Sequence, residues 1–322
     1  MSNNAQIKHP KAGPMKRLFS LLRLFGIVLF VVIMFRVDFP KLLEQLSQAS
    51  PGYLFIGFLF QLIVLITKGI RWHLMNDGGK GKQAWRQSLG RFYESYAIGV
   101  VTPARMGELL KAGHEEGAGN MLATGIRVVA ERGLDIGVFV ILAALSVFGG
   151  NYIGMNVIYT SLILFAGFAS LTVSMLLLAS EKFNALLNAF FQPLPSRFSN
   201  TRIAFKGYQP HISAGIILLS LFSNISYFVS CYFLALAIGL EAGFIWTSGA
   251  VAVSGLLNML PVTIMGVGTR ELTFLYVFRS FPQALALSFS FLVMLVAQMG
   301  GGLVSLVAGQ LLLHSKTENK HV

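Results

Sequence analysis

Apolar segments of roughly membrane-spanning length recur along almost the whole chain and leave room for few architectures. They extend from Leu18 to Leu313 and are separated by short polar connections. Charged residues make up 12% of the 322 residues, against roughly 25% in soluble domains, and the mean hydropathy is +0.68. A water-soluble globule, a disordered chain and a disulfide-stapled secreted module are therefore excluded. The sequence predicts an all-α, polytopic integral membrane helical bundle.

Six apolar runs approach the ~20 residues that a full crossing of the membrane needs, the second being the shortest. These predicted spans cover residues 18–35, 53–67, 128–148, 157–179, 212–238 and 284–313. Two further apolar stretches, residues 92–113 and 244–281, are interrupted by Pro, Gly and charged residues. The eight segments form one predicted transmembrane domain, residues 18–313, between a basic tail, residues 1–17, and a short tail, residues 314–322.

The basic residues, 25 Lys and Arg against 13 Asp and Glu, collect in short connections and indicate the orientation. Connections rich in Lys and Arg face the cytoplasm and attract anionic lipid headgroups. They include the N-terminal tail, the stretch with Lys68 and Arg71 after the second predicted span, and residues 182–211. We therefore expect a multi-pass membrane protein with both termini in the cytoplasm. No nucleic-acid motif accompanies the basic residues, so no nucleic-acid partner is expected.

This orientation constrains the two interrupted stretches. With these assignments, the first stretch must enter the membrane from the cytoplasm and return there. The second must either return to the outer side or cross the membrane twice. The simplest prediction is six full spans plus two re-entrant hairpins that enter from opposite faces. Such paired, interrupted segments are typical of transporter substrate sites and raise the hypothesis of an inverted pseudo-repeat. The alternative is two kinked helices without a role in transport.

Both interrupted stretches carry the same order of residue types: Pro, a small or polar stretch, then Gly beside an acid and a base. The helix-breaking residues are Pro103, Gly107, Pro261, Gly266 and Gly268, and the charged ones are Arg105, Glu108, Arg270 and Glu271. A helix that restarts near Met106 or Thr269 presents free amides and a positive dipole end to a phosphate. Arg105 and Arg270 are expected to add bidentate contacts. Alternatively, the two glutamates cap these helix starts.

A third charged cluster lies at the start of the third predicted span. Arg127, Glu131 and Asp135 follow i, i+4, i+8 spacing and share one helix face, and Arg132 can reach Asp135. An ionisable group at membrane depth costs about 2.5–3.5 kcal/mol on insertion scales and generally faces the bundle interior. We therefore predict Glu131, Arg132 and Asp135 as site residues. A structural salt-bridge lock is the alternative.

Motifs of metal-dependent or nucleophilic catalysis are absent from the sequence. It has no HExxH, no Walker loop and no Gly-x-Ser-x-Gly, and Cys231 is its single cysteine. We therefore expect no catalytic metal, no cofactor and no enzymatic activity. The glycosylation acceptor pattern at Asn224 falls inside a predicted span and is discounted.

In their order along the chain, four motifs resemble a known family. They are Lys-Gly-x-Arg-Trp at residues 68–72, Thr-Pro-Ala-Arg-Met-Gly-Glu at 102–108, Glu-Arg-Gly-Leu-Asp at 131–135, and Leu-Pro followed by Gly-Val-Gly-Thr-Arg-Glu at 260–271. Together they resemble the transmembrane, flippase-like domain of lysylphosphatidylglycerol synthases, as a stand-alone member. The resemblance implies a lipid-handling domain of a bacterial or archaeal inner membrane, and in the best-known members a translocator of modified phospholipid between leaflets. It implies the same charged site residues, Arg105, Glu108, Glu131, Arg132, Asp135, Arg270 and Glu271.

The leading hypothesis is a lipid translocator whose partners are membrane lipids with anionic or phosphate-bearing headgroups. Because only residues 315–322 follow the last predicted span, the synthase activity is not expected in this chain. The alternatives are a secondary transporter of a small solute, a membrane-embedded transferase acting on lipid-linked substrates, and a non-catalytic partner of a lipid- or glycolipid-modifying enzyme. A homo-oligomer is compatible with each of them.

Overall fold

A computed structural model describes residues 39–76, 82–113, 118–150, 157–180, 182–183, 208–259 and 265–314. Throughout these ranges the chain is helical or forms connecting turns, without a β-strand, which confirms the predicted all-α class. The first predicted span, residues 18–35, lies outside the described residues, as do the N-terminal tail and Pro261.

Long helices dominate the chain, and short helices interrupt their succession at two points. In order they are α2 (Phe39–Ser47), α3 (Pro51–Met75), α4 (Lys82–Val101), the 3₁₀-helix η1 (Pro103–Leu109), α5 (Leu110–Gly113), α6 (Ala118–Gly150), α7 (Val157–Ala179), α9 (Pro210–Ala237), α10 (Phe244–Asn258), α11 (Thr269–Val277), α12 (Gln283–Leu292), the π-helix η2 (Val293–Gly300) and α13 (Gly301–His314). The last three continue one another as a single rod of 32 residues, Gln283–His314.

Several described helices are long and apolar enough to cross a membrane, so the chain is a multi-pass membrane protein. Four such stretches are α3, Ser161–Ala179 in α7, His211–Ala237 in α9, and the rod Gln283–His314. Helix α6 is longer still, at 33 residues, but carries the charged cluster predicted from the sequence. The count of six full spans and the inverted pseudo-repeat remain predictions.

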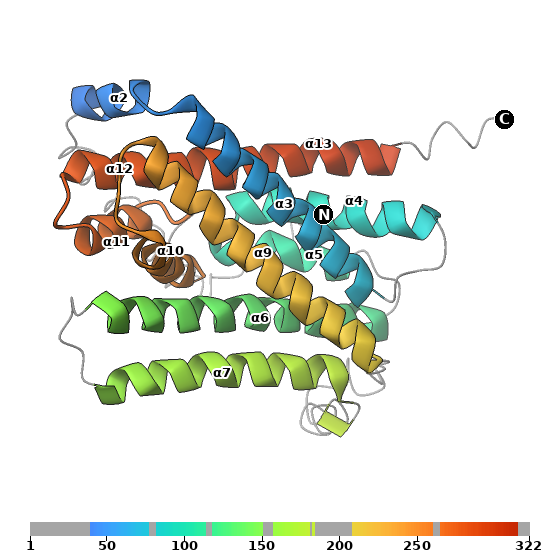
Figure 1. Cartoon of the computed structure of the whole chain (residues 1–322). Helices are drawn as coiled ribbons and strands as arrows, with labels where there is room; N and C mark the ends of the chain where they lie inside the picture. The colour runs from blue at the N-terminus through green and yellow to red at the C-terminus, as the bar shows by residue number, and fades with distance from the viewer. Residues whose placement is uncertain are drawn as a thin grey trace, which may run out of the picture.

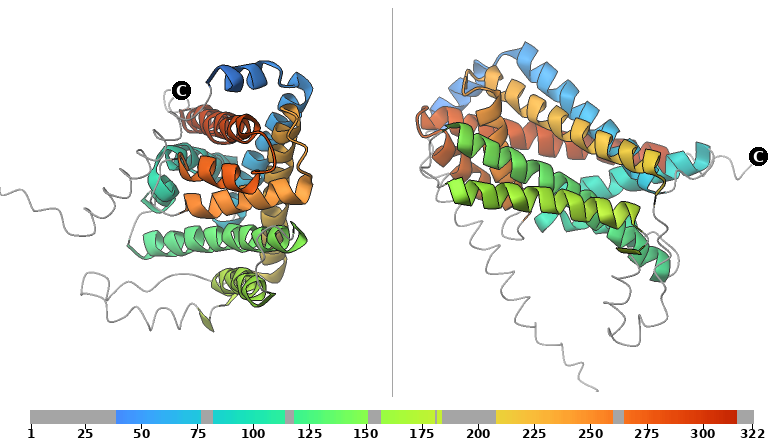
Figure 2. Two further views of the ribbon diagram at one scale, coloured as in Figure 1. Left: turned by 90° about the vertical axis from the view of Figure 1, so that its left-hand side faces the viewer. Right: turned by 60° about the horizontal axis from the view of Figure 1, so that its bottom comes forward.

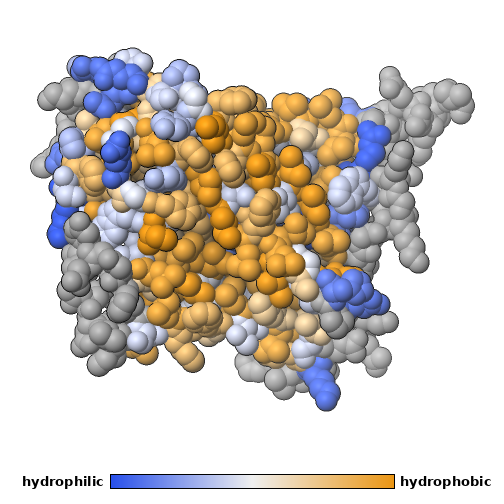
Figure 3. Space-filling view, in the orientation of Figure 1, coloured by the Kyte–Doolittle hydropathy of each residue, from blue (hydrophilic) through white to orange (hydrophobic). Residues whose placement is uncertain are grey.

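The long helices pack in pairs, α3 with α9, α6 with α7, and α4 with α13. Helices α6, α7 and α13 run along one direction, and α3 and α9 cross them obliquely (Figure 1). Apolar side chains cover the middle of the visible face, and hydrophilic side chains gather toward the two ends of these helices (Figure 3). This distribution matches a bundle whose helix direction is the membrane normal, because side chains facing hydrocarbon must be apolar.

The first interrupted stretch stops in the middle of the bundle. Helix α4 begins at the end of the bundle where α13 finishes, since Gly90 packs against Leu313. Val100, near the end of α4, packs against Gly302, close to the midpoint of the rod Gln283–His314. The chain then folds back through η1 and α5 toward the end from which α4 came (Figures 1 and 2).

The second interrupted stretch enters from the opposite end of the bundle. Helix α10 has 15 residues and α11 has 9, so neither reaches the ~20 residues of a full crossing. Gly255, near the end of α10, packs against Phe139 near the midpoint of α6. Helix α11 lies against α10 and leads back to the end where α10 began (Figure 1). Two hairpins from opposite ends thus meet halfway along the long helices.

Candidate functional site

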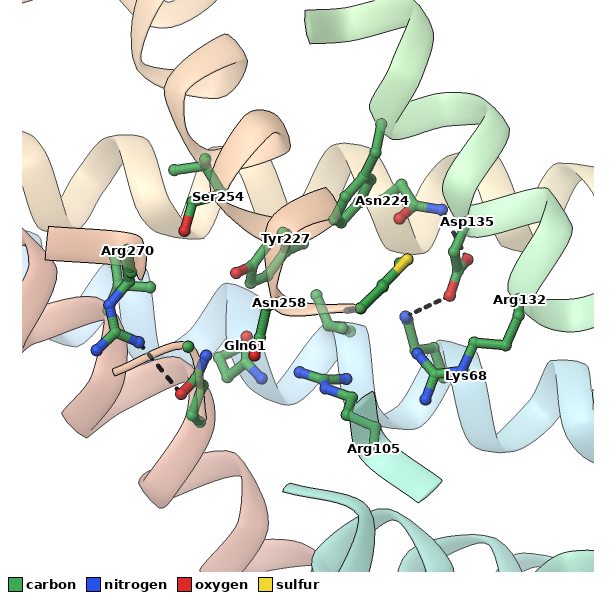
Figure 4. A pocket seen from close by; sticks show the side chains of 18 of the residues that line it. Gln61, Lys68, Arg105, Arg132, Asp135, Asn224, Tyr227, Ser254, Asn258 and Arg270 are labelled. Atoms are coloured by element: carbon green, nitrogen blue, oxygen red, sulfur yellow. Dashed lines mark hydrogen bonds and ion pairs between the residues drawn. The ribbon is translucent and has the colours of Figure 1, made fainter. Parts of the chain in front are cut away.

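A cavity of about 60 Å³ lies where the two hairpins meet (Figure 4). Side chains from α3, α4, η1, α6, α9, α10, α11 and η2 line it. The polar and charged lining consists of Gln61, Lys68, Tyr96, Arg105, Arg132, Asp135, Asn224, Tyr227, Ser254, Asn258, Arg270 and Gln298. The volume has room for a few water molecules or one compact polar group.

The lining carries an excess of positive charge. Lys68, Arg105, Arg132 and Arg270 are cations, and Asp135 is the acid among the described lining residues. Glu108 and Glu271, just outside the lining, pair with Arg132 and Arg270, so the four cations are accompanied by three acids and an excess of one positive charge remains. Inside a membrane bundle the effective dielectric is low, so charges interact strongly. The cavity is therefore suited to an anionic group.

Asp135 is held by three donors from two neighbouring helices. Its carboxylate accepts hydrogen bonds from Lys68 Nζ at 2.9 Å, Arg71 Nη1 at 2.9 Å and Asn224 Nδ2 at 3.0 Å. Arg71 is fully buried and also pairs with Glu131 Oε1 at 2.8 Å. The interior position predicted for Asp135 and Glu131 is thus confirmed, and they lie in a salt-bridge network.

The assignment of Lys68 and Arg71 to a cytoplasmic connection is wrong. Helix α3 continues to Met75, eight residues beyond the predicted end of the span at Thr67, and carries both side chains into the bundle. The signal that could have placed them is their i, i+3 spacing, which puts both on one helix face when the helix is extended. Their partners lie 60 or more residues away in the sequence.

A second set of ion pairs ties the first hairpin to α6. Lys111 Nζ lies 2.9 Å from Glu131 Oε2 and 4.4 Å from the ring centre of Trp72. Arg132 Nη2 pairs with Glu108 Oε1 at 2.6 Å. Glu108 and Glu131, both predicted as site residues, are not among the residues that line the cavity. Glu108 pairs with the lining residue Arg132, whereas Glu131 pairs with Lys111 and Arg71 behind the lining. Lys111 has no exposed side-chain surface, and the sequence analysis gave it no role.

The turn of the first hairpin differs from the prediction. A restarted α-helix near Met106 was expected, but η1 is a 3₁₀-helix there and α5 has only four residues. The reason is local: Thr102 Oγ1 accepts a hydrogen bond from the Gly107 amide at 2.8 Å, and Gly107 lies directly against the backbone of α4 at Gly99. No helix N-terminus is therefore presented at Met106.

Arg105 lies at the tip of this turn with a backbone φ of 53°, in the left-handed region that a non-glycine residue seldom adopts. Its guanidinium points into the cavity (Figure 4). In the described part of the chain it contacts Glu108 at 3.8 Å and lies 5.5 Å from the ring centre of Tyr96, without a hydrogen bond. Its donors are therefore available to a bound group.

The second turn restarts a helix at Thr269, as predicted, but that helix start is capped. Glu271 Oε2 accepts the Gly268 amide at 2.5 Å, which is the capping alternative considered from the sequence. Gly268 and Gly266 adopt φ of 90° and 72°, which glycine permits without steric cost. The Arg270 guanidinium donates to Ser290, Gln298, the Met265 carbonyl and Glu271. Its predicted contact with a phosphate remains a prediction.

Several neutral polar residues of the lining were missed by the sequence analysis. They are Gln61, Tyr227, Ser254, Asn258 and Gln298. They share their helices with other polar residues, among them Thr67 in α3, Ser220 in α9 and Thr247 in α10, so no sequence signal separated them from these. Asn224 is 1% exposed, within α9, and donates to Asp135. Within the described ranges, no cluster of three His, Cys, Asp or Glu side chains is placed to hold a metal ion.

The apolar helices and the charged interior cavity define a multi-pass membrane protein with a polar site at its centre. Residues 22–304 match the model of the family described as the lysylphosphatidylglycerol synthase TM region, and the chain belongs to that family. The resemblance inferred from the four motifs is thereby confirmed. No curated protein and no solved structure matches the chain significantly.

Proposed function

We propose that this protein moves a lipid with a phosphate-bearing headgroup between the two leaflets of the membrane. The observation that carries the proposal is the meeting of two oppositely directed hairpins at a positively charged cavity halfway along the bundle. Interrupted helices at membrane depth that line a cavity are typical of transporter binding sites. Membership of a family related to lipid handling supports a lipid as the cargo.

In this mechanism the headgroup enters the cavity while the acyl chains stay in the surrounding hydrocarbon. Arg105 binds the phosphate, because its guanidinium is available and offers planar, bidentate donors. The network of Glu108, Glu131 and Asp135 holds the other cations in place and lowers the cost of burying them. Each hairpin is the mobile wall on its own side of the membrane, and opening them alternately exposes the headgroup to one leaflet at a time.

A secondary transporter of a small solute is the main alternative, with Glu131 or Asp135 as the ion site. In the structure each carboxylate pairs with Lys or Arg at 2.9 Å or less, which supports charge balancing over the binding of a cation. Uptake of a solute that depends on an ion gradient, with no lipid movement, would favour this alternative.

The proposal is tested by reconstitution of the protein in liposomes with a fluorescent phosphatidylglycerol and measurement of its movement between leaflets by dithionite quenching. Wild type is expected to accelerate movement, and Arg105→Gln to slow it by at least about tenfold, as for loss of a charged contact worth ~1.5–3 kcal/mol. The control is Arg86→Gln, an exposed arginine on α4 outside the cavity. Equal rates for Arg105→Gln and wild type would contradict the site. A folded wild type that moves no lipid would contradict the function.

A further inference from the structure

The rod Gln283–His314 changes its helical geometry at the depth of the cavity. Its central stretch η2, Val293–Gly300, is a π-helix of eight residues between the α-helices α12 and α13. The Gly301 amide at its end donates to the carbonyl of Val296, five residues earlier, as π geometry requires. A π-stretch inside an α-helix is rare and is frequent at functional sites, so its place beside the cavity calls for a physical account.

Hydrogen bonds from neighbouring elements support η2. Gln61 Nε2 of α3 donates to the Ala297 carbonyl at 3.0 Å, and Arg270 Nη1 of the second hairpin donates to Gln298 Oε1 at 3.2 Å. Gln298 also lines the cavity. The stability of the π geometry therefore depends on where α3 and the second hairpin lie.

The rod binds one hairpin on each side of η2. On the α12 side, Ser290 accepts a hydrogen bond from Arg270 Nε at 2.8 Å and donates to Glu271 Oε1 at 2.6 Å, and α12 packs against α11. On the α13 side, Gly302 packs against Val100, and α13 packs along α4 (Figure 1). The π-helix is therefore the junction between a half that holds the second hairpin and a half that holds the first.

A change of η2 from π to α geometry would turn these two halves relative to each other. An α-helix has about 3.6 residues per turn and rises ~1.5 Å per residue, so a register shift of one residue is a rotation of roughly 100°. Shifts of one helical element past another are a known way of switching between two packed states. Here such a shift would move α13, and α4 with it, relative to α12.

We propose that η2 is a conformational hinge that couples the two hairpins. In π geometry the hairpins meet at the cavity, and in α geometry the first hairpin turns away from the second and the cavity opens. A bound anion that accepts a hydrogen bond from Arg270 removes the bond to Gln298, and this gives the cargo its influence on the hinge. The inference adds a conformational step to the proposed translocation and rests on that function.

The first test removes one residue from the hinge of the full-length protein. Deletion of Leu295, whose side chain is exposed on η2, is expected to let the rod continue as an uninterrupted α-helix, with the packing of both halves kept and the change of geometry lost. In liposomes with fluorescent phosphatidylglycerol, this variant is expected to move lipid at least about tenfold more slowly than wild type, because each cycle passes through the hinge. Its apparent Tm is expected to be unchanged or higher. The control Leu295→Ala keeps the chain length and is expected to behave as wild type.

Gly300→Ala tests the same hinge by substitution and covers the case in which the deletion variant does not fold. An added Cβ would lie 3.2 Å from the carbonyl oxygen of Leu295, five residues earlier, so alanine disfavours the π geometry. Alanine is also the better α-helix former. Lipid movement is expected to slow severalfold without a fall in the apparent Tm, whereas unchanged movement would overturn the inference.

A distance measurement decides the hinge independently of transport. Spin labels are placed at Tyr276→Cys on α11 and Leu303→Cys on α13, two exposed positions, in a Cys231→Ala background. Wild type in nanodiscs is expected to show two distance populations, and the Leu295 deletion one.

Three outcomes would overturn the hinge: a single population in wild type, full lipid movement by the folded deletion variant, or an equal loss of movement in Leu295→Ala. If wild type shows both populations and moves no lipid, the hinge stands and the proposed translocation fails.

Discussion

Arg71 connects three helices through the buried polar network, and no sequence pattern around it predicts this role. Its guanidinium donates to Glu131, Asp135 and Ser220, and so links α3 to both α6 and α9. Removing one member of a buried ion pair leaves the partner's charge uncompensated in a low-dielectric interior. The network therefore makes the packing of three helices depend on one side chain.

Arg71→Met is expected to destabilise the protein by roughly 3–5 kcal/mol, because Glu131 and Asp135 each lose a buried partner. The measurement is the apparent Tm of the solubilised protein, from the fraction that remains monodisperse in size-exclusion chromatography after heating. Arg86→Met, which changes an exposed arginine on α4, is expected to leave the apparent Tm unchanged. Equal melting of the two variants would refute the role assigned to Arg71.

Two acidic members of the buried network were predicted to lie in the bundle interior, whereas two of its basic members were misplaced. Glu131 and Asp135 were recognisable because carboxylates inside an apolar helix are costly and share a face at i, i+4. Lys68 and Arg71 come directly after an apolar run, which is also where basic residues mark the cytoplasmic end of a membrane span. Hydropathy does not show whether the last turns of such a helix project into water or lean against a neighbour. Only the three-dimensional pairing with α6 separates these two cases.

At the level of helices, the positions of the two breaks were predictable and their geometry was not. Pro and Gly mark residues 102–108 and 258–268 as places where a helix cannot continue. How the chain resumes depends on tertiary contacts: the first hairpin returns as a 3₁₀-helix pressed onto α4, and the second restarts as the capped helix α11. The first hairpin tolerates this return because Gly107 has no side chain at the contact.

Gly107→Ala is expected to weaken the first hairpin. A Cβ at this position would lie 2.6 Å from the backbone nitrogen of Gly99 and 2.6 Å from the carbonyl carbon of Ile98, and backbone atoms cannot rotate away. Overpacking of this kind costs about 1–3 kcal/mol, so the apparent Tm and the rate of lipid movement are both expected to fall. The matched control is Gly125→Ala in α6, where nothing lies within 4 Å of the added carbon. An unaltered Gly107→Ala protein would show that the return segment is not packed as described.

For the whole molecule, the apolar surface and the charged centre have separate roles. Large apolar side chains on the outer faces are strongly exposed, among them Phe165 on α7 at 73% and Leu311 on α13 at 69%, as expected for a surface solvated by lipid. The formal net charge of +12 belongs mostly to the ends and connections of the chain. The cavity at the meeting point of the hairpins holds a smaller positive excess, to which the anionic headgroup is expected to bind.

The most direct test of the central claim is an experimental structure of the protein in lipid nanodiscs that contain phosphatidylglycerol. Headgroup density is expected in the cavity, with the phosphate within hydrogen-bond distance of the Arg105 guanidinium. The same density is expected to disappear in Arg105→Gln. A cavity filled by protein side chains or water alone, with lipid confined to the outer surface of the bundle in both proteins, would contradict the claim.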